Sequence, residues 1–294
     1  MRRGFLAVLL LASAAAHAAP SCTPLAVVPL ADRADYLALP ARLGGSPVTL
    51  LLDTGATAGL VQPDIARRLG LPGHATPERR LRGTGGRGEM VPIVALPALQ
   101  LGGLAITGLM APVSALPQAP HVLPPVAGLL GADVLSHFQV EIDLPHDRLA
   151  FYRSGDCDGA PPWRAEATEV ALRRMGDRLL ADVRLDGEPM RALLDTGARS
   201  IIVGEAAARR AGAQTLAQEP GGIAGGTDLH PVLYHWHRFG TLAIGGIVLR
   251  APTLTVMPIE EDAPILLGAP FFATRQVWLR YDPPAMFVRI AHRR

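Results

Sequence analysis

An internal duplication constrains this sequence more than any other feature. Residues 43–70 align with residues 185–212 at a constant offset of 142, and fourteen of the 28 aligned positions are identical. The identical positions include the whole run Leu51–Ala56, which recurs as Leu193–Ala198. A duplication of this kind predicts that the chain folds as two related halves with the same elements in the same order.

Each half is expected to consist mainly of short strands. Short apolar runs are separated by turn residues, such as Gly44–Pro47 in the first half and Asp186–Pro189 in the second. The sequence therefore predicts an all-β fold with closed or folded-over sheets and few short helices. The expected strands span residues 37–43, 48–52, 93–101, 138–143, 149–152, 179–185, 190–194, 242–248 and 277–281, and the expected helical turns span residues 63–69 and 205–211.

The chain is expected to divide into four segments. Residues 1–18 have a positive start, an apolar run and a small-residue pattern that ends at Ala18, which is typical of a signal peptide. The apolar run is short for a membrane span, so we expect no stable membrane anchor after cleavage, although a retained anchor is the alternative. The first lobe is expected at residues 19–153, a linker rich in glycine and proline at 154–164, and the second lobe at 165–294. The expected location is the bacterial periplasm or the outside of the cell.

The two cysteines, Cys22 and Cys157, fit an exported protein. In an oxidising compartment they can form a disulfide that joins the mature N-terminus to the linker. Two unpaired thiols are the alternative.

Composition and charge exclude several kinds of partner. The net charge is only +2, from 28 basic and 26 acidic residues, and no basic run is present, so no nucleic acid partner is expected. His230, His235 and His237 have no acidic or cysteine partner at ligand spacing, so no metal site is expected.

Asp53 and Asp195 are the candidate catalytic residues. Each lies at the end of an apolar strand in the hexapeptide Leu-Leu-Asp-Thr-Gly-Ala. A single Asp-Thr-Gly can be an ordinary turn. The same hexapeptide in equivalent places of both halves favours a function for the two carboxylates.

With this pair of motifs the sequence resembles the retropepsin-type aspartic peptidases, in particular the two-lobed bacterial kind fused in one chain. That family has a hydrophobic-hydrophobic-glycine element behind each catalytic loop, and Leu129–Gly131 and Leu266–Gly268 match it. The resemblance covers about residues 38–290. It implies two homologous β lobes with a catalytic cleft between them. Because one chain carries both aspartates, the protein is expected to be a monomer.

The resemblance implies an endopeptidase that acts on a protein or peptide without a cofactor. Two carboxyl groups about 3 Å apart share a proton, because both cannot ionise easily. The ionised group accepts a proton from water, and the protonated group donates one to the scissile carbonyl oxygen. By the same resemblance, Thr54 and Thr196 hydrogen-bond across the lobes. Gly55 and Gly197 let the backbone turn tightly and aim its N–H groups at the carboxylates.

Ala56 and Ala198 stand where many pepsin-like relatives have Ser or Thr. Without that hydroxyl donor, the ionised form of the neighbouring carboxylate is less favoured. We therefore expect an activity optimum at mildly acidic to neutral pH.

The resemblance also implies a glycine-rich hairpin, the flap, that covers the substrate. Two stretches about thirty residues beyond the catalytic aspartates are the candidates. An ordinary flexible loop is the alternative at both places. The candidate residues are Gly83, Thr84, Gly85 and Gly86 in the first half and Gly225 and Gly226 in the second.

Two other functions remain compatible with these motifs. One is a catalytically silent module with the same fold that serves binding or assembly. The other is a narrow processing enzyme with a single protein target.

Overall fold

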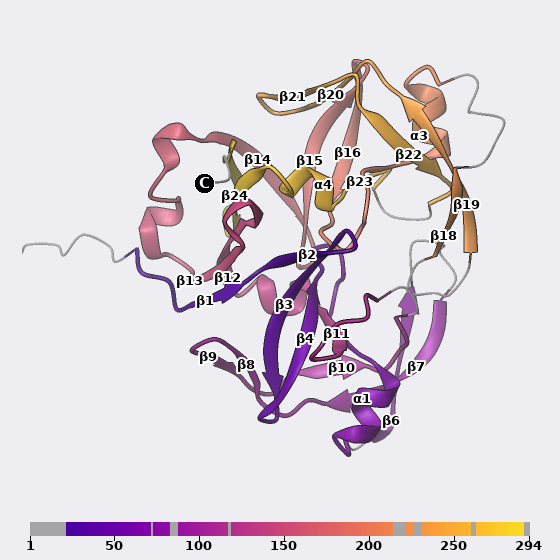
Figure 1. Ribbon diagram of the computed structural model, residues 1–294. Coiled ribbons are helices and arrows are strands. Elements are labelled where there is room, and N and C mark those ends of the chain that lie inside the picture. Colours follow the sequence, from indigo (N-terminus) through magenta and orange to yellow (C-terminus); the bar gives the residue numbers. More distant parts are fainter. Residues whose placement is uncertain are drawn as a thin grey trace, which may run out of the picture.

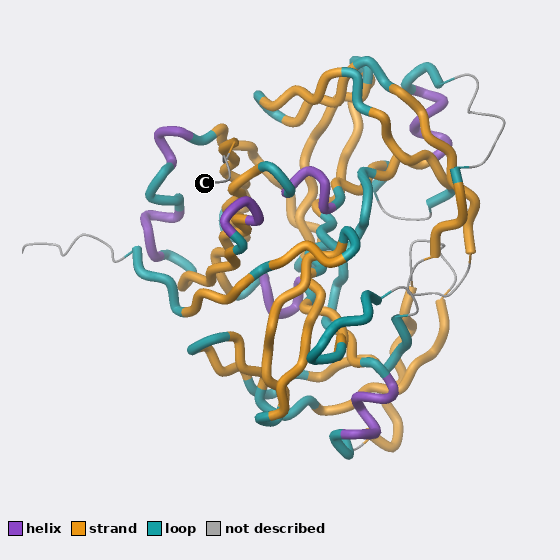
Figure 2. Tube along the Cα trace, in the orientation of Figure 1, coloured by secondary structure: helices purple, strands orange, loops and turns teal. Residues whose placement is uncertain are grey.

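The computed structural model describes residues 22–71, 73–82, 88–116, 119–213, 221–225, 231–259 and 263–290. The two halves of the chain lie one above the other in Figure 1, with the first half below. The tube in Figure 2 is mostly strand, in agreement with the predicted all-β fold. The expected signal peptide, residues 1–18, lies outside the described residues.

The helices of the described residues are all short. None of them is long and apolar enough to cross a membrane. The α-helices are α1 (Pro63–Arg68), α2 (Ala132–Leu135), α3 (Glu205–Arg210) and α4 (Ala269–Phe272), and the 3₁₀ segments are Leu144–His146, Asp156–Gly159 and Arg164–Glu166.

The first half contributes two sheets. The larger one has the strand order β5 (Leu60–Val61), β11 (Val126–Leu130), β4 (Ser46–Leu52), β3 (Tyr36–Leu43), β8 (Leu99–Leu101) and β9 (Leu104–Ile106), and β2 (Ala31–Arg33) pairs with β3. The smaller sheet has the order β10 (Met110–Pro112), β7 (Gly88–Ala95) and β6 (Gly73–Arg82).

The second half has the corresponding sheet. Its path runs through β14 (Thr168–Met175), β15 (Arg178–Leu185), β16 (Glu188–Leu194), β23 (Ile265–Leu267), β17 (Ile202–Gly204), β22 (Thr253–Met257), β19 (Pro231–Arg238) and β18 (Gly222–Gly225), and the hairpin β20 (Thr241–Ile244) and β21 (Ile247–Arg250) pairs with β15.

Strands from both halves also form a shared sheet, which the sequence did not predict. It lies at the left of Figure 1. Its order is β1 (Ala26–Pro29), β13 (Arg148–Arg153), β12 (Phe138–Asp143), β24 (Arg275–Tyr281), β25 (Pro284–Ile290) and β14. The central pair, β12 and β24, is antiparallel and joins equivalent strands of the two halves, with Val140 opposite Leu279. The halves are therefore joined by backbone hydrogen bonds as well as by side chains.

The duplication seen in the sequence is repeated element by element. Strands β3 and β15 begin at Tyr36 and Arg178, which differ by the same offset of 142 residues. The predicted hairpins and both helical turns are confirmed, with ends that shift by one or two residues.

Two predicted strands were wrong because each contains a turn. Residues 93–101 are divided between β7 and β8, with a break that includes Pro97. Residues 242–248 form the hairpin β20–β21, which turns at Gly245 with a φ of 55°. Proline cannot donate to a strand ladder, and a positive φ favours glycine, so both breaks have a local cause.

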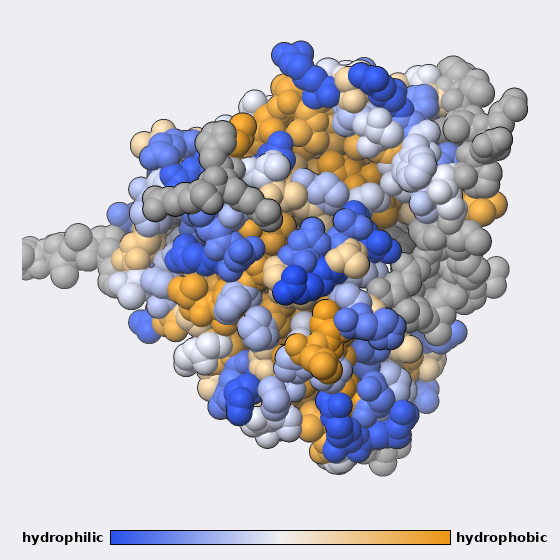
Figure 3. Space-filling view, in the orientation of Figure 1, coloured by the Kyte–Doolittle hydropathy of each residue, from blue (hydrophilic) through white to orange (hydrophobic). Residues whose placement is uncertain are grey.

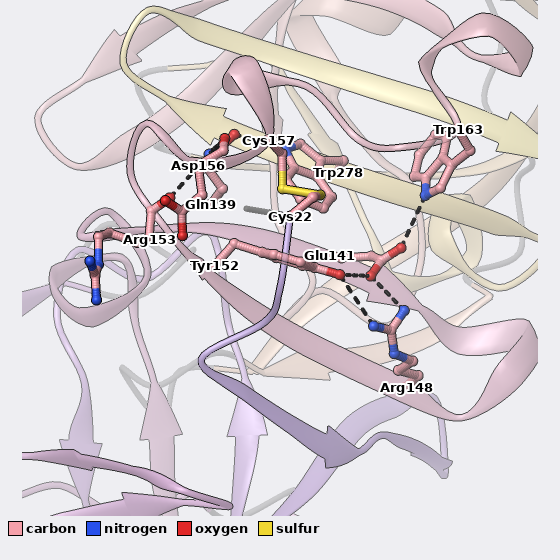
Figure 4. The surroundings of a disulfide bond; sticks show 10 residues. All are labelled: Cys22, Gln139, Glu141, Arg148, Tyr152, Arg153, Asp156, Cys157, Trp163 and Trp278. Carbon is pink, nitrogen blue, oxygen red and sulfur yellow. Dashed lines mark hydrogen bonds and ion pairs between the residues drawn. A yellow bond between two sulfur atoms is a disulfide. The ribbon is translucent and has the colours of Figure 1, made fainter. Parts of the chain in front are cut away.

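The segment predicted as a linker, residues 154–164, packs against the shared sheet. Cys157, Ala160 and Trp163 are buried there. The structure joins Cys22 to Cys157 by a disulfide (Figure 4), which ties the start of the described chain to this segment.

A buried carboxylate stabilises the same region. Glu141 on β12 is only 2 % exposed, and hydrogen-bond donors surround its carboxylate (Figure 4). Its oxygens accept hydrogen bonds from Arg148 (2.6 Å), Tyr152 (2.9 Å), Trp163 (3.1 Å) and Gln276 (2.6 Å). Because a buried charge must be paired to be tolerated, these donors make the position specific for a carboxylate.

Aliphatic side chains form most of the core, which extends through both halves and the shared sheet. On the face drawn in Figure 3, apolar residues are most visible over the upper half, and polar residues cover both halves.

Candidate active site

Asp53 and Asp195 lie at equivalent strand ends. Asp53 follows β4 and Asp195 follows β16. The backbone N–H of Asp53 donates to the carbonyl of Leu130 at 3.0 Å, and that of Asp195 donates to the carbonyl of Leu267 at 3.1 Å. Each aspartate is therefore fixed by the strand that runs parallel beside its own.

The hydrophobic-hydrophobic-glycine elements form the parallel strands that hold the two aspartates in place. Strands β11 and β23 pair in parallel with β4 and β16, respectively. The glycine at the end of each element lies directly under the Asp-Thr-Gly loop of the same half. A Cβ added to Gly131 would lie 2.4 Å from the carbonyl carbon of Ala58, and one added to Gly268 would lie 2.0 Å from the oxygen of Ser200. Only glycine leaves room for the loop to cross there.

The two Asp-Thr-Gly loops meet closely. A Cβ added to Gly55 would lie 2.5 Å from Cγ of Asp195, and one added to Gly197 would lie 2.4 Å from Cγ of Asp53. Hydrogen bonding with the side chain of Asp195 is one of the influences that lower the pKa of Asp53. Two residues that are 142 positions apart in the sequence thus form one dyad.

The glycines of the motif are required for a reason that was not expected from the sequence. Neither Gly55 nor Gly197 has a positive φ, so the tightness of the turn does not require glycine. The requirement comes from the opposing aspartate, whose carboxyl group occupies the space that a side chain would need.

Backbone N–H groups of each loop face the carboxylate of the same loop. Oδ1 of Asp53 accepts hydrogen bonds from the N–H groups of Gly55 (3.1 Å) and Ala56 (2.9 Å). Oδ1 of Asp195 accepts the equivalent bonds from Gly197 (3.1 Å) and Ala198 (3.2 Å). These donors orient one oxygen of each carboxyl group and favour its ionised form.

Thr54 and Thr196 form a symmetrical network across the two halves. The hydroxyl of Thr54 donates to the carbonyl of Leu194 at 2.8 Å and accepts a hydrogen bond from the N–H of Thr196 at 3.0 Å. The hydroxyl of Thr196 donates to the carbonyl of Leu52 at 2.8 Å and accepts from the N–H of Thr54 at 3.0 Å. Both threonines are buried, so the network holds the loops in register away from water.

Burial raises the pKa of Asp53 above its ordinary value. The N–H groups of Ala56 and Gly55, the hydrogen bond to Asp195 and the positive charge of Arg178 act in the opposite direction and lower it. Asp53 and Asp195 are nevertheless only partly buried.

Arg178 and Tyr36 are neighbours of the dyad that the sequence analysis missed. The positive charge of Arg178 is one of the influences that lower the pKa of Asp53. Burial raises the pKa of Tyr36, and the charge of Asp53 acts in the same direction. The signal was present, because extending the repeat eight residues upstream of Gly44 and Asp186 aligns Tyr36 with Arg178. The equivalence was easy to overlook because the two positions carry different residues, a tyrosine and an arginine.

The two flap candidates lie outside the described residues except for Gly225. Strands β6 and β7 pair as far as Arg82 and Gly88, so they lead directly to the candidate stretch in the first half. In the second half, Gly225 pairs with Pro231 at the end of β18 and β19. Both hairpins lie at the right of Figure 1, on the same side of the molecule.

Of the histidines considered for a metal site, His230 lies outside the described residues. His235 and His237 lie on β19. In the part of the chain that the structure describes, no group of three or more His, Cys, Asp or Glu side chains could hold a metal ion.

Two β-rich halves that each supply one Asp-Thr-Gly loop to a shared dyad define the aspartic-protease class of structure. Comparison with protein families agrees with this geometry. The family model described as aspartyl protease matches residues 39–134 and 181–271, one match in each half. The matches together cover more than half of the chain, which therefore belongs to this family. The double match confirms the resemblance to two-lobed retropepsin-like peptidases. A search of curated proteins found no match.

Proposed function

We propose that this protein is an aspartic endopeptidase that hydrolyses peptide bonds with a water molecule activated between Asp53 and Asp195. The contact between these carboxyl groups, supplied by opposite halves, is the observation that carries the proposal. Their partial exposure supports access for water and for a substrate chain.

The proposed chemistry divides acid and base roles between the carboxyl groups. The ionised member accepts a proton from the water, which attacks the peptide carbonyl carbon. The protonated member donates a proton to the carbonyl oxygen, so a tetrahedral intermediate forms without a covalent bond to the enzyme. The Thr54–Thr196 network keeps the two groups at a fixed separation during both transfers. Acid and base are both present in the dyad, so this reaction requires no cofactor.

We also propose that the protein is exported and acts as a monomer in the periplasm or outside the cell. The signal-peptide pattern of residues 1–18 and the Cys22–Cys157 disulfide support export. The presence of both aspartates in one chain supports activity without a second copy. Sequencing the N-terminus of the protein from a periplasmic fraction tests cleavage, and Ala19 is the expected first residue.

The decisive experiment compares wild type with Asp195→Asn on an unfolded protein and on a mixed peptide library. We expect wild type to produce new fragments, pepstatin to suppress them, and the variant to lose about a thousandfold or more of the activity. Asp64→Asn, which removes an exposed carboxylate on α1, is the matched control and should retain full activity.

The same assay separates the other functions. Cleavage of only one protein in a periplasmic extract would identify a processing enzyme with a narrow target. The proposal would be contradicted, and a silent binding module favoured, if wild type yields no fragments from any substrate between about pH 3 and pH 8, a range that includes the upper apparent pKa of about 4.7 of a known carboxylate dyad.

A further inference from the structure

Each Asp-Thr-Gly loop is held by the short helix that follows the Leu-Leu-Gly strand of its own half. In the first half, the N–H of Ala132, the first residue of α2, donates to the carbonyl of Ala56 at 2.9 Å. In the second half, the N–H of Ala269, the first residue of α4, donates to the carbonyl of Ala198 at 2.8 Å. This contact is therefore common to both loops.

The next residue of each helix breaks the symmetry. It is Asp133 in α2 and Pro270 in α4. Oδ1 of Asp133 accepts hydrogen bonds from the N–H of Gly59 at 2.8 Å and from the N–H of Val134 at 3.0 Å. The side chain of proline offers no acceptor. The bond from Asp133 to Gly59 therefore cannot be repeated by the equivalent residue of the second half.

Helix α2 thus holds the segment 56–59 at both of its ends. It binds the carbonyl of Ala56 at one end and the N–H of Gly59, through Asp133, at the other. Ala56 also faces the dyad, because its N–H donates to Oδ1 of Asp53 at 2.9 Å. The place of this donor therefore depends on how firmly the segment 56–59 is held.

The surroundings of Asp133 make its carboxylate hard to replace. Burial raises the pKa of Asp133, whereas the N–H groups of Gly59 and Val134 and the positive charge of Arg79 on β6 lower it. Apart from Asp133, the residues that line the hollow beside it are all apolar or glycine, among them Leu60. No other side chain of this lining can accept the hydrogen bond from Gly59.

We propose that Asp133 is a positioning residue that holds the segment 56–59 against α2 and thereby fixes the Ala56 N–H that faces Asp53. The inference rests on the proposed function, because it gives a part in peptide hydrolysis to a residue that acts through Gly59 and Ala56. A small displacement of a group that orients the reacting atoms slows the chemical step strongly. The role of Asp133 should therefore appear in kcat.

Steady-state kinetics on a peptide substrate test the proposal. Asp133→Ala removes the acceptor, so kcat should fall about tenfold or more while KM stays nearly unchanged. Asp133→Asn keeps an oxygen at the place of Oδ1 and should retain most of kcat. A rise in KM with kcat unchanged would overturn the proposal. An equal loss of kcat in Asp133→Ala and Asp133→Asn would overturn it as well.

Asp64→Ala is the matched control. Asp64 is an exposed carboxylate at the second position of α1, as Asp133 is at the second position of α2, so its removal should leave kcat and KM at the values of wild type. Thermal unfolding establishes that each variant is folded. If Asp133→Ala does not fold, Asp133→Glu takes its place. The longer side chain keeps the charge and displaces the oxygens, so its kcat should fall below that of Asp133→Asn.

Amide hydrogen exchange gives a readout that needs no turnover. In Asp133→Ala, the amides of Gly59 and Ala56 should both exchange faster than in wild type, and the amide of Ala198 in the second half should not change. Faster exchange at Gly59 alone, with Ala56 as protected as in wild type, would show that Asp133 only stabilises its own helix and would refute the proposal. If wild type cleaves no peptide, the proposed function fails, and this comparison still decides the role of Asp133.

Discussion

The Thr54–Thr196 network offers the sharpest test of how the two halves are joined. Thr196→Val replaces the hydroxyl by a methyl group of nearly the same size. The change removes the bond to the carbonyl of Leu52 and the bond from the N–H of Thr54, at 2.8 and 3.0 Å. Thr196 is 0 % exposed, so water cannot replace either partner without opening the interface.

The expected loss follows from these two bonds. A buried donor or acceptor that is left unpaired costs about 1–3 kcal/mol, so the two together cost about 2–6 kcal/mol. Proteins are stable by only about 5–15 kcal/mol in total, so the effect should be easily measured. Thr196→Ser keeps the hydroxyl and loses one methyl group, which should cost about 1 kcal/mol.

Urea unfolding measures both variants. Tryptophan fluorescence is a suitable probe, because Trp163 and Trp278 are buried against the shared sheet. Peptidase activity should decline with Thr196→Val more than with Thr196→Ser, since the loops lose their register. A loss for Thr196→Val no larger than that for Thr196→Ser, with activity intact, would refute the view that this network holds the dyad together.

Three further predictions address the loops, the disulfide and the dyad. Gly197→Ala should abolish peptide cleavage, because the added Cβ would lie 2.4 Å from Cγ of Asp53. Gly103→Ala is the control and should retain activity in the same cleavage assay, because the atom nearest to its added Cβ lies 3.8 Å away. Reducing the Cys22–Cys157 disulfide, which closes a loop of 135 residues, should lower the free energy of unfolding by about 3–5 kcal/mol in urea titrations with and without reductant. Burial raises the pKa of Asp53, so the folded protein favours the neutral carboxyl group. The contribution of this group to the free energy of unfolding is therefore present at low pH and is lost as the pH rises. Asp53→Asn should therefore unfold at a higher temperature than wild type at pH 7, with a smaller difference near pH 4; equal differences at both pH values would contradict this.

The hairpins, helical turns and paired motifs could be predicted because their signals are local. Turn residues such as Gly45 and Gly187 have a positive φ, and the apolar runs beside them form the expected strands. The two mispredicted strands failed for the opposite reason. Apolar residues on both sides of Pro97 and Gly245 concealed the turns there.

The roles of individual site residues were harder to predict. Glycine in Asp-Thr-Gly suggests a tight turn when the motif is considered alone. The structure shows that Gly55 and Gly197 make room for the aspartate of the other half. Arg178 acts on Asp53, and Asp53 acts on Tyr36, although 125 and 17 positions separate these residues from Asp53 in the sequence. Such effects depend on the orientation of one half relative to the other.

The sequence by itself determined that the protein has two related β-rich halves and that each carries one Asp-Thr-Gly loop and one supporting Leu-Leu-Gly strand. These properties follow from periodicity, turn residues and repetition, which nearby residues encode. Only the tertiary structure decided that β12 and β24 join the halves in one sheet, that Glu141 is buried among its donors, and that Arg178 lies beside Asp53. Those contacts arise between distant segments, whose approach depends on how the whole core packs.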